Sequence, residues 1–538
     1  MKERRLFDES GRMKQSRPPM QIMRNLALAI GVAAAAAHAQ TTNSFSTKSL
    51  ALNDCIQLAL QHNFDVRIER VNPEIARYNV SLAYAGYDPG LDFRATHSYN
   101  SSLGTLINGT LSIPASATKS DSFNVGIGGA APIDSGLTYS LNASVSQTVG
   151  DRFNPISTVV TNGGVVTTNT SFLAAPFQNA NGSVSISLTQ PLLKNLWIDN
   201  IRYNIQISKS QLRGTEWGLR GRIIDIITQV ETAYYNLIAA RENVKVQEKA
   251  LQLAEQLLAE NKKKVEVGAL AQLDEKQAES QVASSRADLL TAQNTLGTRQ
   301  RVLKNLLSDD YSEWSNVLID PAEPLTAVPQ MLNLQASWQN GLTMRPDLEQ
   351  ARLNADQLGI TLKFQRNQLF PQLDLTGTFG RNGNSGVYSE VFGQIRDAEG
   401  PFYSVGAEFR IPLGNQAARN NYKITKAQRA QALLRLKQLE QTIMVGIEDA
   451  VGTAIGNYER VKATREASSY ADEALKAEQK KLENGKSTNF EVLQLQKNLT
   501  AARSAEIQAL ADYNNALAAL AASEGTTLQR LNLSLEVK

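Results

Sequence analysis

Cysteine and histidine are nearly absent from this chain of 538 residues. The only cysteine is Cys55, and the three histidines are His38, His62 and His97. A single thiol excludes an intrachain disulfide and any metal cluster built on several cysteines. Scattered histidines are more typical of surface or packing positions than of metal ligands. The sequence therefore predicts no metal site and no bound cofactor.

Motifs for catalysis and for phosphate binding are also missing. The sequence contains no glycine-rich phosphate loop, no His-Glu-x-x-His and no nucleophile elbow. The formal net charge is +3, but residues 1–39 hold seven basic and three acidic residues, a net charge of +4, which leaves about −1 for the remainder. This balance gives no sign of a nucleic-acid-binding surface. We therefore expect a protein that is not an enzyme and has no nucleic-acid partner.

Long apolar runs are lacking too. The run LALAIGVAAAAAHA follows Arg24, ends in Ala37-His38-Ala39, and is too short to span a bilayer. A basic start, a short apolar stretch and an A-x-A end are typical of a secretory signal. We therefore predict that residues 1–39 are a signal peptide, with a buried helix as the alternative.

The stretch before Met20 is unusually long for the start of a signal peptide. Translation could therefore begin at Met20 or Met23 instead of Met1, which would make the first residues an upstream extension. Cleavage after Ala39 would leave Gln40 first, and the lack of a cysteine there argues against a lipoprotein. The sequence predicts export, and it leaves the start codon open.

The two halves of the chain match each other at fixed offsets. Shifting residues 50–93 by 282 positions, and residues 231–303 by 217, aligns similar residues without a gap. Leucine and alanine coincide often by chance in helices, whereas proline, glycine and aspartate do not. We therefore predict an internally duplicated protein with a longer insert in its first half. The matches include Asp65 with Asp347, Pro89 with Pro371, Asp92 with Asp374 and Gly268 with Gly485.

Four short segments alternate apolar and polar residues, which is the period of a β-strand with one apolar face. Each lies next to a proline, and we expect these prolines to mark junctions between helices and strands. The strands are predicted at residues 91–99, 184–190, 373–379 and 405–411, and the junction prolines are Pro89, Pro191, Pro371 and Pro412.

Such strands form either a half-exposed sheet or a transmembrane barrel, apolar toward lipid and polar toward a water-filled lumen. The export signal and the absence of a membrane helix favour the barrel. Four strands cannot close a barrel, and open edges cannot lie in lipid, where their N–H and C=O groups find no partner. Several copies must therefore share strands. Three copies would supply twelve, although closure alone does not fix the number three.

Residues 100–182 form a long insert rich in Ser, Thr, Asn and Gly. Within it, residues 123–127 and 137–145 could add a β-hairpin. The stretch TVVTNGGVVTTNT, residues 158–170, indicates a mobile loop. In a barrel this insert would be extracellular, because the longer loops lie on the outer side.

Two proline-free stretches, residues 200–267 and 416–484, predict helices of about 68 residues, or roughly 100 Å at 1.5 Å per residue. Two apolar stripes on each helix allow a neighbour on both sides. Such helices can close into a cylinder, and a two-stranded coiled coil is the alternative. On the first helix, one stripe contains Val244, Leu251, Ala254, Leu258 and Val265, and the other contains Val246, Ala250, Leu253 and Leu257.

Each long helix ends near a glycine, in VEVGALAQLDEKQAES at Gly268 and in LENGKSTNFEVLQLQ at Gly485. Glycine is favoured just past a helix end because it accepts a left-handed backbone. Thr488 and Glu491 have the spacing of a capping box that opens the next helix. Both breaks therefore predict helix-turn-helix tips at the end of the assembly that is far from the strands.

With these tip motifs, the repeated order of elements and the proline-bounded strands, most of residues 48–524 resembles the TolC-type outer-membrane efflux channels, the outer membrane factors. The resemblance implies a homotrimer with a β-barrel in outer-membrane lipid and an α-helical tunnel in the periplasm. It also implies tips that close the periplasmic entrance and dock a periplasmic adaptor (membrane fusion) protein. The adaptor would join an inner-membrane pump of the RND or ABC type, and transport through the channel itself would be passive.

In such channels a Tyr, an Arg and two Asp shape the second tip, and the matching positions here are Leu482, Ser487, Glu491 and Gln494. The Asp of the first tip is kept as Asp274. The resemblance thus implies a gate that is less acidic and held by different polar links. Three copies of Glu491 across a narrow lumen would attract cations and repel anions. The alternative is that Glu491 only caps its helix.

The sequence therefore predicts an α+β membrane protein: a trimeric β-barrel with four strands per protomer, continuous with a long periplasmic α-helical barrel. It would be the exit duct of a tripartite efflux or type I secretion system, and an exported coiled-coil scaffold of the cell envelope is the alternative. The expected segments are 1–39 (signal peptide), 40–90 and 332–372 (N-terminal helices of each repeat), 91–190 and 373–411 (strands), 191–307 and 412–524 (tunnel helices), 308–331 (linker) and 525–538 (tail).

Overall fold

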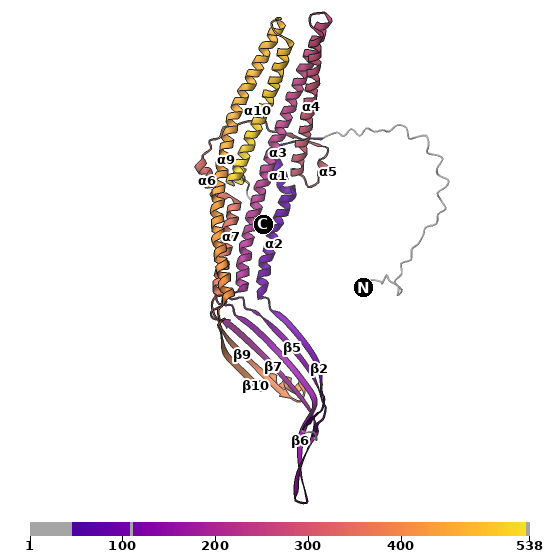
Figure 1. Ribbon diagram of the computed structural model, residues 1–538, viewed down its shortest axis with the longest axis vertical. Coiled ribbons are helices and arrows are strands. Elements are labelled where there is room, and N and C mark those ends of the chain that lie inside the picture. The colour runs from indigo at the N-terminus through magenta and orange to yellow at the C-terminus, as the bar shows by residue number, and fades with distance from the viewer. Residues whose placement is uncertain (1–45, 108–110, 534–538) are drawn as a thin grey trace, which may run out of the picture.

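The computed structural model describes residues 46–107 and 111–533, and the molecule is elongated, with helices at one end and a β-sheet at the other (Figure 1). The predicted signal peptide, residues 1–39, lies outside the described residues, and so do the three candidate start methionines. Among the helices that the structure describes, none combines the length and the apolar character needed to cross a membrane.

Two long helices form the axis of the helical part. α3 (Asn200–Glu266) and α9 (Gln416–Glu483) have 67 and 68 residues, so each is about 100 Å long at 1.5 Å per residue. At their far ends they turn back into shorter helices, α4 (Gln272–Leu307) after α3 and α10 (Asn489–Glu524) after α9. The two long helices expected from the sequence are confirmed, each to within one residue at both ends.

α3 packs against both of the shorter helices, α4 and α10. Val244 and Ala254 of its first apolar stripe are buried, and Leu257 of its second stripe packs against Leu475 of α9 and Val492 of α10. The expectation that the long helices have more than one helical neighbour is therefore confirmed for α3. A simple two-stranded coiled coil does not describe this packing.

Each half of the chain begins with a pair of short helices. They are α1 (Leu52–His62) and α2 (Phe64–Tyr84) in the first half, and α6 (Leu334–Met344) and α7 (Pro346–Asn367) in the second. The second pair starts 282 residues after the first, which is the offset that aligns the sequence. α2 packs against α3, and α7 packs against both α3 and α9.

The most extensive hydrophobic core surrounds the middle of α3. There, β1 (Ser46–Leu50) pairs in parallel with β8 (Val317–Pro321). Tyr234 is fully buried, and its hydroxyl group donates a hydrogen bond to the backbone carbonyl of Leu50 at 3.1 Å. The linker between the two halves therefore contributes β8 and the short α5 (Tyr311–Trp314) to the waist of the molecule.

An ion pair between an exposed arginine and a buried glutamate fastens the end of the chain to this waist. The Arg530 guanidinium of α11 (Thr527–Arg530) lies 2.5 and 2.6 Å from the two carboxylate oxygens of Glu231 on α3. Glu231 is only 1% exposed, and burial raises the pKa of its carboxyl group despite the opposing effect of Arg530. The pair holds α11 against α3.

Six antiparallel strands form the sheet at the other end, in the order β10-β9-β7-β6-β5-β2. The expectation of four strands per protomer is wrong. The insert after β2 supplies β5 and β6, because its alternating segments pair with each other and with β2 and β7. The bounds are β2 (Gly90–Ser102), β5 (Ser116–Ala130), β6 (Thr138–Asn162), β7 (Val165–Pro191), β9 (Gln372–Ser385) and β10 (Gly400–Arg410).

The predicted hairpin within the insert is thus confirmed, whereas the mobile loop expected at residues 158–170 is wrong. β6 and β7 continue beyond the sheet as a two-stranded hairpin, seen at the lower end of Figure 1. They turn at Gly163 and Gly164, whose φ values of +61° and +86° suit a two-residue hairpin turn. β-branched residues such as Val160 and Val165 on either side favour strands, so the glycines form a turn and not a loop.

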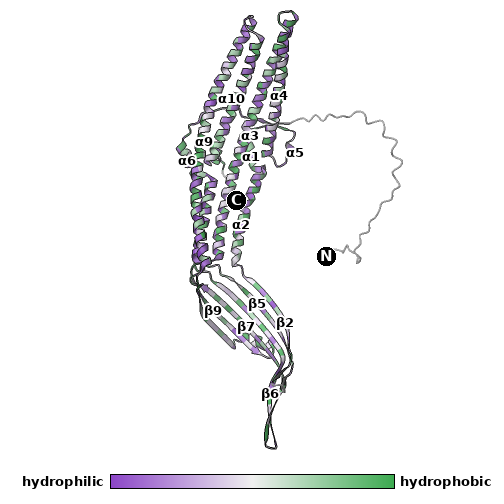
Figure 2. Ribbon diagram, in the orientation of Figure 1, coloured by the Kyte–Doolittle hydropathy of each residue, from purple (hydrophilic) through white to green (hydrophobic). Residues whose placement is uncertain are grey.

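The sheet has one apolar and one polar face. On the polar face, the hydroxyl oxygens of Ser144 and Ser183 are 2.9 Å apart, and those of Ser187 and Thr378 are 3.0 Å apart. Figure 2 shows the strands alternating between hydrophobic and hydrophilic residues. On the apolar face, the register aligns one row across all six strands: Leu91, Ile127, Leu141, Ile186, Phe379 and Tyr403.

The remaining elements lie in the connections between the strands. β3 (Thr105–Ile107) and β4 (Leu111–Ile113) form a short antiparallel pair between β2 and β5. α8 (Tyr388–Arg396) connects β9 to β10 and buries Val391 against Gly182 and Gly383 of the sheet. The outer end of the sheet is thus partly covered by its own connections.

We predict that Arg530→Ala lowers the free energy of unfolding by about 3 kcal/mol at pH 7, because it leaves the Glu231 carboxylate buried without its partner. A carboxyl group with a raised folded-state pKa binds its proton more readily in the folded state, so it favours folding as the pH falls. Without Arg530 this pKa rises further. The loss should therefore be smaller at pH 5 than at pH 7.

Chemical denaturation of the detergent-solubilised protein at the two pH values measures this loss. The double variant Glu231→Leu with Arg530→Leu serves as the control, because it removes both charges and should recover most of the stability. A loss of the same size at both pH values would contradict the role given to the buried carboxylate.

Candidate functional site

Two turns at the free end of the long helices form the first candidate site, at the upper end of Figure 1. In each turn the glycine has a positive φ, +75° at Gly268 and +68° at Gly485. In the second turn the backbone N–H of Lys486 donates to the carbonyl of Lys481 at 2.9 Å, and the first turn makes the equivalent bond at 2.7 Å. Both turns are Schellman motifs, in which glycine avoids the strain of a left-handed backbone.

Polar contacts order the second tip. The hydroxyl group of Ser487 donates to Oε1 of Glu478 at 2.5 Å, and Nζ of Lys481 lies 2.8 Å from Oε2 of the same carboxylate. The hydrogen bond from Lys481 and, to a smaller extent, that from Ser487 lower the pKa of the Glu478 carboxyl group. Thr488 caps α10 by accepting the backbone N–H of Glu491 at 3.4 Å, which is one half of the predicted capping box. Ser487 thus binds within its own hairpin.

The other predicted gate residues have different surroundings. Glu491 and Gln494 are exposed one turn apart on α10, and Nε2 of Gln494 donates to Oδ1 of Asn498 at 3.2 Å. Leu482 is half-buried against a hydrophobic cluster of α3, α9 and α10. Asp274 is half-buried in the first turn of α4. Within one protomer, Glu491 and Asp274 therefore belong to different tips.

A groove of about 340 Å³ lies between the two tips, and sequence reasoning missed it. Leu273 of α4 and Phe490 of α10 line the groove and are 66% and 59% exposed. They are 217 residues apart, at equivalent positions of the two halves, which is the signal that could have identified them. Lys276, Gln494 and Lys497 line the groove beside them. Exposed apolar side chains with a polar surround are typical of a docking surface.

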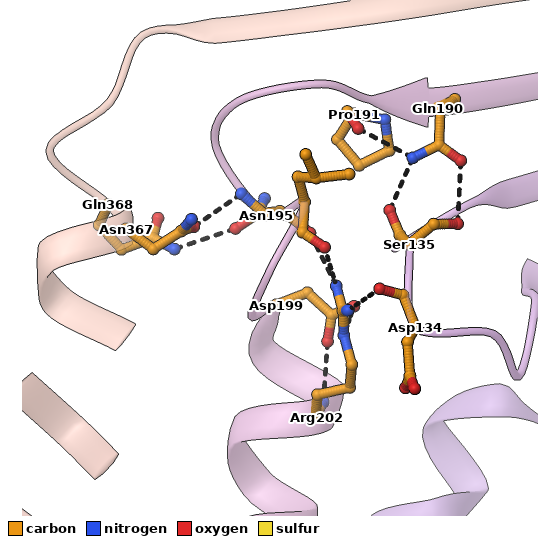
Figure 3. Close-up of polar contacts among 10 residues, drawn as sticks. Asp134, Ser135, Gln190, Pro191, Asn195, Asp199, Arg202, Asn367 and Gln368 are labelled. Atoms are coloured by element: carbon orange, nitrogen blue, oxygen red, sulfur yellow. Dashed lines mark hydrogen bonds and ion pairs between the residues drawn. The ribbon is translucent and has the colours of Figure 1, made fainter. Parts of the chain in front are cut away.

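Arg202 is the centre of a second candidate site, the junction cluster, where the helices meet the sheet (Figure 3). It lies in the first turn of α3, is only 8% exposed, and its Nε is 3.0 Å from Oδ2 of Asp199. Its Nη2 donates to the carbonyls of Asn195 and Leu196 at 2.8 and 2.9 Å. Its Nη1 donates to the carbonyl of Asp134 at 2.5 Å. Because Asp134 belongs to the turn between β5 and β6, Arg202 ties that turn to α3.

Amide side chains extend the junction cluster to the second half of the chain (Figure 3). The backbone N–H of Asn195 donates to Oδ1 of Asn367 at 2.7 Å, and Nε2 of Gln368 donates to Oδ1 of Asn195 at 2.9 Å. On the sheet side, Gln190 and Ser135 exchange two hydrogen bonds, of 2.7 and 3.0 Å. The cluster therefore joins the β5-β6 turn, the end of β7, the start of α3 and the end of α7.

The predicted junction prolines all lie at strand ends, but sequence reasoning missed Arg202. Its signal was modest: Asp199 precedes it by three residues at the start of a helix, a spacing that suits a helix-capping ion pair. The structure places Pro89 just before β2, Pro191 at the end of β7, Pro371 just before β9 and Pro412 shortly after β10.

Within the described residues, the structure shows no cluster of metal-binding side chains, and the thiol of Cys55 is buried. Across residues 46–107 and 111–533, no group of three or more His, Cys, Asp and Glu side chains could hold a metal ion. Cys55 is buried in the waist core, and burial, assisted by Asp54, raises the pKa of its thiol to about 12. A protonated, buried thiol of this kind is unreactive.

The model of a protein family described as "Outer membrane efflux protein" matches residues 166–308 and 338–526, which together are more than half of the chain. Outer membrane protein TolC of Vibrio cholerae is 23% identical over 354 residues, which cover 63% of this chain and 75% of that protein. Outer membrane efflux protein BepC of Brucella suis is 22% identical over 358 residues, which cover 66% of this chain and 74% of that protein.

Solved structures share the fold over nearly the whole length. The CmeC outer membrane channel of Campylobacter jejuni has a TM-score of 0.61 at 17% identity, and the match covers 90% of both chains. The open-state MtrE outer membrane channel of Neisseria gonorrhoeae has a TM-score of 0.60 at 18% identity, with 89% of both chains covered. At these identities the likeness concerns the fold.

We predict that Arg202→Ala lowers the free energy of unfolding by about 3 kcal/mol, because three backbone carbonyls and the Asp199 carboxylate lose a buried cationic donor. Arg202→Lys should recover little, since an ammonium group cannot reproduce the planar fork of donors. Thermal unfolding in detergent measures the effect. Arg213→Ala, an exposed change on the same helix, is the matched control. Equal melting temperatures for Arg202→Ala and Arg213→Ala would contradict the anchoring role.

Proposed function

This chain belongs to the outer membrane efflux protein family, and we propose that it is the exit duct of a tripartite efflux or type I secretion system. In this assembly the sheet lies in outer-membrane lipid, and the helices form a tunnel in the periplasm. The tips face a periplasmic adaptor protein and an inner-membrane pump of the RND or ABC type. The pump supplies the energy, and solutes pass through the duct passively.

The observation that supports this function best is the direct continuation of a two-faced sheet into helices about 100 Å long. The apolar face of the sheet suits lipid, and the polar face suits a water-filled lumen. The junction cluster around Arg202 fixes the start of α3 to the sheet. The sheet, as the channel wall, and the helices, as the tunnel wall, are therefore rigidly connected.

We infer a homotrimer of internally duplicated protomers. Among the described strands, β2 and β10 each have a neighbour on one side only, and their unpaired backbone groups cannot remain open in lipid. The two strands run in opposite directions, so β2 of one copy can pair with β10 of the next in an antiparallel ladder. The similar hairpins α3-α4 and α9-α10 then alternate around a closed ring of helices.

The tips form the periplasmic entrance in this proposal. Glu491 is exposed on α10, so three copies would place three carboxylates around the opening, while Gln494 adds no charge. Ser487 binds Glu478 of its own hairpin, which supports a gate held by fewer links between hairpins. The groove with Leu273 and Phe490 offers the adaptor an apolar docking surface.

We predict that Glu491→Gln lowers the cation-over-anion permeability ratio by about fivefold, the effect of losing about 1 kcal/mol of attraction at the entrance. Reversal potentials of single channels in a potassium chloride gradient measure the ratio. Gln494→Glu should change it in the opposite direction. Glu466→Gln, an exposed change on α9, is the control. If Glu491→Gln and the control give the same ratio, Glu491 acts only as a helix-cap residue.

A duct and an exported coiled-coil scaffold differ in how they are held at the membrane. We predict that the protein stays in the outer-membrane fraction after washing with alkaline carbonate, because a closed barrel is released only when lipid is dissolved. A scaffold bound at the surface would appear in the wash. Immunoblots of the pellet and wash, with a known barrel and a known peripheral protein as controls, decide between the two functions.

A further inference from the structure

We propose that three copies of this chain close a barrel of eighteen strands, in which β5 and β6 are membrane-spanning wall strands and the lumen is wide. The proposal rests on the trimer of the proposed function and on six strands in each copy. It replaces the twelve strands that the sequence suggested. The neighbour of each free sheet edge is a second copy of this chain.

β5 and β6 lie inside the sheet and not at its margin. β6 pairs with β5 over thirteen residue pairs, from Thr118 to Ala130 on β5, and with β7 on its other side. β2 reaches β7 only through these two strands. A wall without them would require β2 to pair directly with β7, whereas the structure separates these two strands by the full width of β5 and β6.

The inserted strands β5 and β6 each have one apolar and one polar face, as strands in a membrane-spanning barrel wall do. Val125 and Ile127 of β5 and Leu141 of β6 lie on the apolar face and are 38%, 38% and 43% exposed. Asn124 and Asn142 alternate with them and point to the polar face. A spanning strand needs about 9–11 residues, and the thirteen paired residues exceed this. A surface hairpin would have no need for an apolar face continuous with its neighbours.

The inner turn of this hairpin is fastened to the helices. Arg202 donates to the carbonyl of Asp134, and Ser135 exchanges hydrogen bonds with Gln190 of β7 (Figure 3). Gly136 has a φ of +70°, and a Cβ there would lie 2.6 Å from the carbonyl oxygen of Asn195. The turn is thus fitted closely to the junction cluster, as expected for a fixed strand connection.

The number of strands sets the size of the lumen. Barrel diameter grows roughly linearly with strand number, so eighteen strands give about 1.5 times the diameter of twelve, a size at which porin barrels hold an aqueous channel. Small neutral residues such as Ser144, Ser183 and Thr378 line the polar face. The outer-membrane part of the duct therefore suits large hydrated solutes.

Single-cysteine labelling tests the proposal, because the buried native Cys55 does not react near neutral pH. Leu141→Cys and Asn142→Cys are adjacent on β6 but lie on opposite faces. In lipid nanodiscs, a sulfonated maleimide should label Asn142→Cys roughly tenfold faster or more, because a charged reagent avoids hydrocarbon. Val125→Cys and Asn124→Cys repeat the test on β5, in case one variant fails to fold.

The pair Ile186→Cys and Ser187→Cys on β7 is the matched control, because β7 is a wall strand in a barrel of either size. Contrast on β7 without contrast on β5 and β6 would overturn the eighteen strands and leave the duct intact. A lack of contrast on all three strands would overturn the proposed function itself. Native mass spectrometry should give three chains per particle, and any other number would also overturn the count of eighteen.

Discussion

The unpaired backbone of two sheet edges is the constraint on which the rest of the structure depends. β2 and β10 bound the sheet of one protomer, and lipid provides no partner for their N–H and C=O groups. Within one chain the edges stay apart, and in the proposed trimer the neighbouring copies supply their partners. The helical part likewise depends on lateral contacts, because α3 packs against both α4 and α10. In the proposed trimer, neighbouring copies therefore complete the fold of each protomer.

The junction cluster connects a wide β-sheet to a narrower layer of helices. Two additional strands widen the sheet by about 10 Å at 4.7–4.9 Å each. α2 and α3 nevertheless remain in contact where they meet the sheet, and a Cβ at Gly86 would lie 2.9 Å from the side chain of Ile201. The sheet must therefore spread outward from the helices. Arg202 lies where that spreading begins, and its buried guanidinium group holds the β5-β6 turn against the start of α3.

The sequence predicts the helices better than the sheet, for physical reasons. Gly268 and Gly485 mark helix ends through a backbone that only glycine adopts easily, so both ends were predicted closely. The count of four strands failed because the repeat identifies only elements present in both halves, and β5 and β6 have no counterpart. The prediction of a mobile loop at residues 158–170 was wrong because the two glycines of a tight hairpin turn resemble a flexible segment in the sequence. Arg202 was missed because its partners are carbonyl groups of distant loops, which no local pattern encodes.

An electron cryomicroscopy map of the protein in lipid nanodiscs would show directly whether three copies close one barrel. We predict a particle with threefold symmetry, eighteen strands in the lipid-embedded wall, and β2 of each copy paired with β10 of the next. A twelve-stranded wall with β5 and β6 outside it, or a sheet whose edges remain open, would rule out the eighteen-stranded barrel.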